Sequence, residues 1–189
     1  IKNLGDIHHP DSGYGIYQNR AKSNIIRNVT VVNAPSNGIA VRAGDHMLVD
    51  NARVYCDEGV VTPGMSKAQI LLAMHASTDY YIQVGGNNNI VKNSIVERVG
   101  NLGHGGAGIG IKYGGQNSVF SNNKAINMKG ESFYVRYPPP PTLYYNNLMT
   151  YTSVRLQKYR SYTDYSVEFS PSVNIVVGPN ASGKTNLLE

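Results

Sequence analysis

Ile25-Ile-Arg-Asn28 is the first copy of a short pattern: two apolar residues, a polar residue and then asparagine. The later copies are Leu48-Val-Asp-Asn51, Ile90-Val-Lys-Asn93 and Val119-Phe-Ser-Asn122. The first two asparagines are 23 residues apart, and Asn51 and Asn93 are 42 apart, which is close to two periods. A pattern that returns at a fixed period of this length indicates a repeat architecture.

A second type of segment, often led by glycine, lies between these copies. Its members are Gly15-Ile-Tyr17, Gly38-Ile-Ala-Val41, Leu72-Ala-Met74, Gly108-Ile-Gly-Ile111 and Ser132-Phe-Tyr-Val135. Such a period with two or three short strands per repeat suits a parallel β-helix, in which each rung buries its inward side chains against neighbouring rungs. A β-sandwich of hairpins is the alternative, but it predicts several Asn-Gly turns and the chain has only Asn37-Gly38.

Glycine and asparagine mark the corners between these strands, because both tolerate left-handed backbone angles at low cost. Asparagines at matching corners can also form a side-chain ladder that satisfies buried backbone groups. On these segments, residues 1–136 resemble the right-handed parallel β-helix, pectate-lyase-like superfamily. The resemblance implies an all-β fold, a location outside the cell or at its surface, and polysaccharides as partners, which many members bind, cleave or epimerise. Other members are adhesive or structural, so a non-catalytic structural β-helix stays open.

The composition agrees with a β-rich chain and identifies no partner by itself. Hydrophobic residues make up 41% of the 189 residues and charged residues 15%, with 20 glycines and no tryptophan. The net charge of +5 permits an acidic partner. Cys56 is the only cysteine, and no apolar run approaches the roughly 20 residues that span a bilayer. Candidate calcium ligands are Asp45, Asp50, Asp57, Glu58 and Asp79.

Four segments of the second type align so that a basic residue follows each of them. They are Ile39-Ala-Val-Arg42, Leu72-Ala-Met-His75, Ile109-Gly-Ile-Lys112 and Phe133-Tyr-Val-Arg136. The apolar first and third positions are expected to point inward, and the second and fourth outward. This predicts a ledge of small residues beside a column of basic side chains at a spacing of roughly 4.8 Å. Stacked like charges repel, and an acidic polysaccharide lying along the ledge would offset them.

The superfamily resemblance gives this column a chemical interpretation. Uronate lyases of the superfamily use a basic side chain to remove the proton next to a carboxylate, while other cations neutralise that carboxylate. The resemblance implies Lys112 or His75 as the base, with Arg42 and Arg136 as the clamps. The simpler alternative is that Lys and Arg at strand ends keep the sheet face soluble and block edge pairing.

The run Tyr137-Pro-Pro-Pro-Pro141 is predicted to end the repeats, since four prolines remove four backbone donors. The predicted domains are therefore residues 1–136, a proline-rich junction at 137–148, and a segment of different composition at 149–189. In this last segment Ser153-Val-Arg-Leu156 and Tyr165-Ser-Val-Glu-Phe169 are predicted strands. The apolar run Val173-Asn-Ile-Val-Val177 follows them.

That run leads into Gly178-Pro-Asn-Ala-Ser-Gly-Lys-Thr185, which fits the phosphate-binding pattern G-x-x-x-x-G-K-[ST]. The expected nucleotide-binding residues are Gly178, Asn180, Ser182, Gly183, Lys184 and Thr185. Lys184 would bridge the β and γ phosphates of ATP, and the Thr185 hydroxyl would ligate Mg²⁺. Backbone N–H groups would cradle the phosphates. The stretch predicts an incomplete α/β P-loop segment, because residues 186–189 supply only one helical turn.

Residues 149–189 closely resemble the N-terminus of RecF and its relatives, ATPases of the structural-maintenance-of-chromosomes type. The matching stretches are 155–162, 167–169 and 174–189. The resemblance implies ATP and Mg²⁺ as cofactors, DNA as a partner in recombinational repair, and a cytoplasmic location. The acidic and signature motifs that the family needs are missing here, so we expect weak or no nucleotide binding and no ATPase activity. We expect both ends to be cut, and the different compartments of the two parts favour a gene-model, assembly or engineered junction.

Overall fold

The computed structural model describes residues 13–34, 36–57, 63–70, 78–99, 106–112, 114–136 and 142–150, and the backbone of strands at 153–159 and 162–168. In this part of the chain the regular structure is β, apart from one helical turn at 67–70. The all-β prediction is therefore confirmed. The chain divides into two units, Ile1–Thr150 and Tyr151–Glu189.

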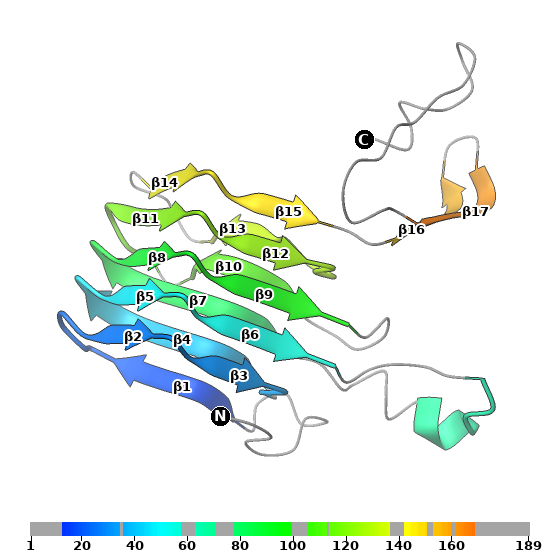
Figure 1. Cartoon of the computed structure of the whole chain (residues 1–189), viewed down its shortest axis with the longest axis horizontal. Helices are drawn as coiled ribbons and strands as arrows, with labels where there is room; N and C mark the ends of the chain where they lie inside the picture. The colour runs from blue at the N-terminus through cyan, green and yellow to red at the C-terminus, as the bar shows by residue number, and fades with distance from the viewer. Residues whose placement is uncertain are drawn as a thin grey trace, which may run out of the picture. The chain divides into compact units, whose positions relative to one another are not determined.

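Three parallel five-stranded sheets form the first unit, and consecutive strands go to different sheets (Figure 1). The first sheet contains β1 (Tyr14–Asn19), β4 (Asn37–Asp45), β7 (Tyr80–Asn87), β10 (Ala107–Ile111) and β13 (Phe133–Val135). The second contains β2 (Ile25–Arg27), β5 (Leu48–Asp50), β8 (Ile90–Lys92), β11 (Ser118–Ser121) and β14 (Thr142–Tyr145). The third contains β3 (Thr30–Val32), β6 (Arg53–Cys56), β9 (Ile95–Arg98), β12 (Lys124–Ile126) and β15 (Leu148–Thr150). Three consecutive strands make one rung, and the rungs stack in chain order as a parallel β-helix.

The asparagine-ended segments lie in the second sheet, in the register that the repeat predicts. Ile25, Leu48, Ile90 and Val119 are successive partners across this sheet. The next residue of each segment points inward and is buried; these residues are Ile26, Val49, Val91 and Phe120. All pairings between strands of the first unit are parallel, which confirms the β-helix and excludes the sandwich of hairpins.

The asparagines that follow these strands adopt a left-handed backbone, as predicted for corner residues. Their φ angles are 57° at Asn28, 51° at Asn51, 52° at Asn93 and 54° at Asn122. Their side chains also contact one another along the outside: Asn51 donates to Asn28 at 2.8 Å, and Asn122 to Asn93 at 3.5 Å. This outer ladder is exposed and does not serve buried backbone groups.

A second ladder lies one residue further along each rung and is buried. The N–H groups of Ala52, Ser94 and Asn123 donate to the side-chain oxygens of Ser94, Asn123 and Asn147, at 3.2, 2.9 and 3.0 Å. The Asn123 amide nitrogen also donates to the Val91 carbonyl at 2.9 Å. This inner ladder, which the sequence pattern did not reveal, satisfies backbone groups that would otherwise be buried without partners.

The first sheet corrects one predicted rung. Strand β7 lies between β4 and β10, with Ile82 opposite both Ile39 and Ile109. The place assigned to Leu72-Ala-Met-His75 therefore belongs to Ile82-Gln-Val-Gly85. The alignment was wrong because 43 residues separate Ile39 from its partner Ile82, so the chain between β6 and β7 interrupts the period.

The β-helix also continues beyond the boundary predicted at residue 136. Strands β14 and β15 pair in parallel with β11 and β12, so the last rung ends at Thr150. Leu143-Tyr-Tyr-Asn146 repeats the asparagine-ended pattern, with Tyr145 in place of the usual polar residue. An outward tyrosine fits this position because it is 45% exposed, and its polar tip can remain in water.

In the second unit, β16 (Ser153–Tyr159) and β17 (Tyr162–Glu168) form an antiparallel hairpin. Both predicted strands of this segment are therefore present; the first continues to Tyr159, and the second begins at Tyr162, three residues earlier than expected. Residues 169–189, which include the phosphate-binding pattern, lie outside the described residues. The α/β P-loop segment stays a prediction.

Candidate functional site

A column of cationic side chains follows the carboxyl ends of the strands in the first sheet. Val84 lies opposite Val41 and Ile111, and Ile111 lies opposite Val135. The residues that come next in each strand are Arg42, Gly85, Lys112 and Arg136, on successive rungs. We call Arg42, Lys112 and Arg136 the cationic column. The structure thus brings together three of the four predicted basic residues and places Gly85 where His75 was expected.

Tyr80 forms an aromatic platform beside the carboxyl-terminal part of the cationic column, where Lys112 and Arg136 lie. Lys112 Nζ lies 4.0 Å from the centroid of the Tyr80 ring, and the guanidinium carbon of Arg136 lies 5.5 Å from it. Arg136 Nη1 also donates to Tyr80 Oη at 2.8 Å. The negative face of an aromatic ring attracts cations, so one tyrosine stabilises two neighbouring charges of like sign.

Glu131 neutralises Arg136. Nη2 of Arg136 donates to both carboxylate oxygens, at 2.9 and 2.6 Å. A backbone hydrogen bond, and after it the Arg136 side chain, lower the pKa of the Glu131 carboxyl. Because Arg136 already holds a carboxylate, it is less suited to clamp one from a ligand. Glu131 and Tyr80 were not singled out from the sequence, and nothing in the repeat pattern marks them.

Arg42 lies at the other end of the column, next to Tyr17. The guanidinium carbon is 5.8 Å from the ring centroid, and Tyr17 is 43% exposed. Gly85 separates Arg42 from Lys112. A Cβ atom on Gly85 would lie 2.6 Å from the Lys112 carbonyl oxygen, so the close approach of these rungs requires glycine. The two cations are therefore about two rungs, or roughly 10 Å, apart.

The predicted ledge beside the column is buried, which corrects the expectation of a solvent-facing surface. Ala40 is 0% exposed, Gln83 1% and Tyr134 4%. Asn37 Nδ2 donates to Gln83 Oε1 at 2.7 Å. Burial raises the pKa of Tyr134 well above its ordinary value. An outward direction from a strand therefore does not ensure exposure. Among the described residues of this sheet, the charged groups that are partly exposed are the three cations of the column and Asp45 at the end of β4.

Two groups of predicted site residues lie outside the described residues. The first is His75, proposed as a base. The second is the nucleotide-binding set, Gly178, Asn180, Ser182, Gly183, Lys184 and Thr185. Their roles, together with ATP and Mg²⁺, stay predictions.

Three of the four described candidate calcium ligands are engaged by amide side chains of neighbouring rungs, and the fourth is Asp79. Asp45, Asp50 and Asp57 accept hydrogen bonds from Asn88, Asn93 and Asn33, at 3.2, 2.9 and 2.7 Å. In the ranges that the structure describes, no three His, Cys, Asp or Glu side chains gather as a metal site. Glu58 lies outside those ranges, and calcium binding stays a prediction.

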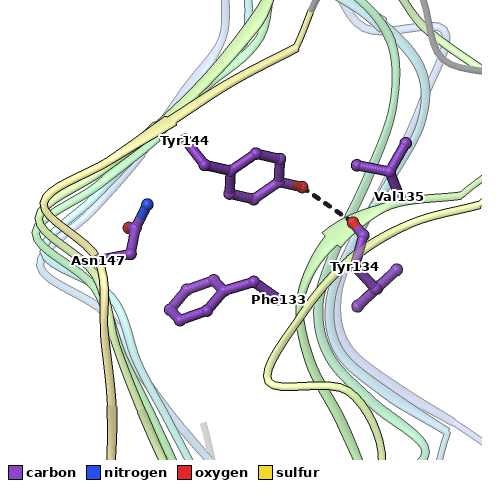
Figure 2. Close-up of a pocket in the computed structure, with 5 residues that line it drawn as sticks. All are labelled: Phe133, Tyr134, Val135, Tyr144 and Asn147. Atoms are coloured by element: carbon purple, nitrogen blue, oxygen red, sulfur yellow. Dashed lines mark hydrogen bonds between the residues drawn. The ribbon is translucent and has the colours of Figure 1, made fainter.

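A cavity of about 300 Å³ opens at the last rung (Figure 2). It is lined by Phe133, Tyr134, Val135, Tyr144 and Asn147. Figure 2 shows the Tyr144 ring pointing across it, with its hydroxyl donating to the Tyr134 carbonyl at 2.9 Å. The walls are mainly apolar, and no charged side chain lines the cavity.

Comparison with curated proteins finds short matches to "DNA replication and repair protein RecF". The protein from Protochlamydia amoebophila (strain UWE25) is 54% identical over 41 residues, which is 22% of this chain and 11% of the relative. The protein from Listeria welshimeri is 57% identical over 37 residues, 20% of this chain and 10% of the relative. The chain thus spans about a tenth of the length of these relatives. Comparison with solved structures finds no match.

The described part of the chain contains no helix that is long and apolar enough to cross a membrane. The family model described as "Right handed beta helix region" matches residues 5–177. This range includes all fifteen strands of the three parallel sheets. The chain therefore belongs to the right-handed β-helix family.

Proposed function

We propose that the chain binds an acidic polysaccharide along the cationic column and does not cleave it. The alignment of Arg42, Lys112 and Arg136 on three of four successive levels of one sheet carries this proposal. An extended ligand parallel to the helix axis meets one rung about every 4.8 Å. Each half-exposed charge contributes only about 0–1 kcal/mol, but several contacts on one polymer reinforce one another.

The three cations are proposed to have different roles. Lys112 on the Tyr80 ring and Arg42 beside Tyr17 contact the carboxylates of the ligand. The exposed Tyr17 ring offers an apolar face against which a sugar can pack. Arg136, which is bound to Glu131 and Tyr80, holds the Tyr80 platform in place.

The chemistry of the column supports binding more than elimination. Removal of a proton next to a carboxylate needs an unprotonated base close to the carbon. The face of Tyr80 favours the charged ammonium of Lys112, and guanidinium groups do not deprotonate in proteins. The described column therefore offers cations and no proton acceptor.

Calorimetric titration of the full chain with polygalacturonate tests this proposal. The double variant Arg42→Ala/Lys112→Ala is expected to bind about tenfold more weakly. The control, Lys92→Ala/Lys124→Ala, removes two positive charges from the second and third sheets and is expected to bind normally. Fully methyl-esterified polymer, which lacks the carboxylate charge, is expected not to bind. An equal loss of affinity in both double variants would contradict specific binding along the cationic column. The absence of any binding by the parent chain would favour a purely structural β-helix. Formation of unsaturated sugar product would contradict the absence of cleavage.

A second candidate function rests on the similarity to RecF. The matched stretch of 41 residues is as long as the segment 149–189, whose sequence carries the phosphate-binding pattern. We infer at most weak binding of Mg-ATP by this segment, through Lys184 and Thr185. Titration of the full chain with a fluorescent ATP analogue, with Lys184→Ala as the control, tests the inference. Tight binding that Lys184→Ala abolishes would show a more complete site than we infer.

A further inference from the structure

The two ends of the β-helix differ in how their inward side chains are covered. In the first rung, Ile26 and Val31 are 7% and 0% exposed. In the last rung, Met149 is 54% exposed, although Ala125, its partner one rung below, is 0% exposed. Val135, also an inward residue of the last rung, is 39% exposed. Among the described residues of the first unit, the inward side chains at the carboxyl-terminal end of the β-helix therefore form an apolar surface that no further rung covers.

The backbone of the last rung repeats this difference. At the asparagine corners of the second sheet, the N–H groups of Asn51, Asn93 and Asn122 donate to carbonyls of the next rung, at 3.2, 3.1 and 3.3 Å. In the inner ladder, the N–H of Asn123 donates to Asn147 Oδ1. The equivalent donors of the last rung are the N–H groups of Asn146 and Asn147, and they have no acceptor among the described residues.

The aromatic stack of the core also stops at this end. Phe120 is 0% exposed because Tyr144 covers it. The cavity of Figure 2 lies beside Tyr144 and is bounded by Phe133, Val135 and Asn147. The inward residues Ile111, Phe120 and Ala125 of the rung below are 1%, 0% and 0% exposed, so the cavity at the last rung marks the place where a further layer would lie.

We propose that this open end docks a β-helix rung from another polypeptide, which adds in parallel to β14 and β15. The occupant places an aliphatic or aromatic side chain over Tyr144. Three residues later it supplies an asparagine or serine whose side-chain oxygen accepts the Asn147 N–H. This spacing occurs in three rungs of the chain itself: Val91 and Ser94, Phe120 and Asn123, Tyr144 and Asn147. Strand addition of this kind uses main-chain hydrogen bonds for affinity and side-chain positions for specificity.

A second copy of this chain fits the end less well. Head to tail, it would present Val29 at the inner-ladder position, where no side-chain oxygen is available for the Asn147 N–H. Its inward residues Ile26 and Val31 are already covered. Tail to tail, the Asn147 side-chain oxygen would be unavailable because it accepts from the N–H and the side-chain amide of Asn123.

The charge of the surface agrees with an uncharged, rung-like occupant. Residues 133–136 and 142–150 contain one charged side chain, Arg136, and Glu131 neutralises it. No electrostatic repulsion therefore opposes a neutral strand. The inference stands independently of polysaccharide binding, because it uses the end of the β-helix and not the cationic column.

The probe for this inference is a synthetic peptide with the sequence of residues 117–127, which carries Phe120 and Asn123 at the required spacing. Added to the full chain, the peptide is expected to slow hydrogen exchange at the Asn146 and Asn147 amides by about tenfold or more. The control peptide carries Phe120→Lys and Asn123→Leu and is expected to give no protection. Polarisation of the labelled peptides measures their affinities.

Two variants of the chain separate docking from folding. Met149→Lys places a charge on the open end, and Leu143→Lys places one on the outer face of the same rung. Both residues are about half exposed, at 54% and 55%, so neither change is expected to alter Tm noticeably. Met149→Lys is expected to weaken peptide binding at least about tenfold, and Leu143→Lys to leave it unchanged.

Four results would overturn the proposal. The first is a control peptide that binds as tightly as the probe peptide. The second is an equal loss of peptide affinity in Met149→Lys and Leu143→Lys. The third is protection of Asn146 and Asn147 that grows with protein concentration without peptide, because a second copy would then be the occupant. The fourth is full protection at every concentration without peptide, because another segment of the same chain would then fill the position.

Discussion

Phe120 and Tyr144 stack face to face across the last two rungs, with ring centroids 4.5 Å apart and ring planes 6° apart. Phe120 is completely buried, and burial raises the pKa of Tyr144 well above its ordinary value. The Tyr144 hydroxyl donates to the Tyr134 carbonyl at 2.9 Å, which links the second sheet to the first. The pair therefore joins two layers and two sheets at once.

We expect Phe120→Ala to lower the free energy of unfolding by about 3–5 kcal/mol, because it removes the stack and leaves a cavity inside the rung. Urea unfolding followed by circular dichroism measures the change. The matched control is Ile90→Ala in the same sheet; Ile90 points outward, is 40% exposed, and is expected to cost less than about 1 kcal/mol. Similar costs for both variants would contradict the assigned packing.

Asn122 tests whether the corner asparagines act through their backbone or through their side chains. With φ at 54°, Asn122→Gly is expected to change stability by only a few tenths of a kcal/mol. Asn122→Val is expected to cost about 1–2 kcal/mol, because a β-branched residue is strained in this region. Thermal unfolding compares the two variants. If both lose stability equally, the 3.5 Å contact to Asn93 matters more than the backbone angle.

Gly38 is required by a close approach and not by its backbone angle. A Cβ atom there would meet the Val54 side chain and lie 2.6 Å from the Tyr81 carbonyl oxygen. We expect Gly38→Ala to destabilise the fold by about 1–3 kcal/mol through overpacking. Gly130→Ala is the control, because the nearest atom would lie at an ordinary 3.5 Å. If Gly38→Ala leaves the free energy of unfolding unchanged in chemical unfolding, the close approach at Gly38 would be contradicted.

The repeat predicted the parts of the fold that one rung shares with the next. Strand register, inward positions and left-handed corners all follow from the spacing of Ile25, Leu48, Ile90 and Val119, because stacked rungs place equivalent residues in one column. The prediction failed where the period broke. Because of the long connection before β7, one rung was predicted at the wrong residues. The last copy of the pattern was missed because Tyr145 stands where the other copies have a polar residue.

The candidate site was predictable only in part. Arg42, Lys112 and Arg136 share a column because each follows an apolar strand position, which is a local property of the sequence. Tyr80 and Glu131 reach these cations from other parts of the rungs, and such contacts depend on three-dimensional packing. The burial of the ledge was also unpredictable, since alternation gives the direction of a side chain and not what covers it.

Asp50 predicts how stability depends on pH. The hydrogen bond from Asn93, with the charges of Lys92 and Arg27, holds the pKa of Asp50 below its ordinary value. A carboxyl whose pKa is lower in the folded state stabilises the fold above its unfolded pKa, about 3.9, and this stabilisation is lost as the pH falls through the lower folded pKa. Asp50→Asn is therefore expected to be less stable than the parent at pH 7, with a difference that shrinks below about pH 4. Urea unfolding at several pH values measures this, and a constant difference would contradict it.

Arg136 and Lys112 are expected to differ in ligand binding although they are neighbours in the cationic column. Lys112→Ala removes a charge that faces the ligand and is expected to weaken binding to polygalacturonate about threefold to fivefold. Arg136→Ala is expected to have at most about a twofold effect, because Glu131 already neutralises that guanidinium at 2.6 Å. Glu131→Gln releases the arginine and is expected to strengthen binding by about twofold to threefold. Calorimetric titration ranks the three variants. If Arg136→Ala weakens binding as much as Lys112→Ala while Glu131→Gln has no effect, Arg136 contacts the ligand directly and the roles assigned to the two cations are wrong.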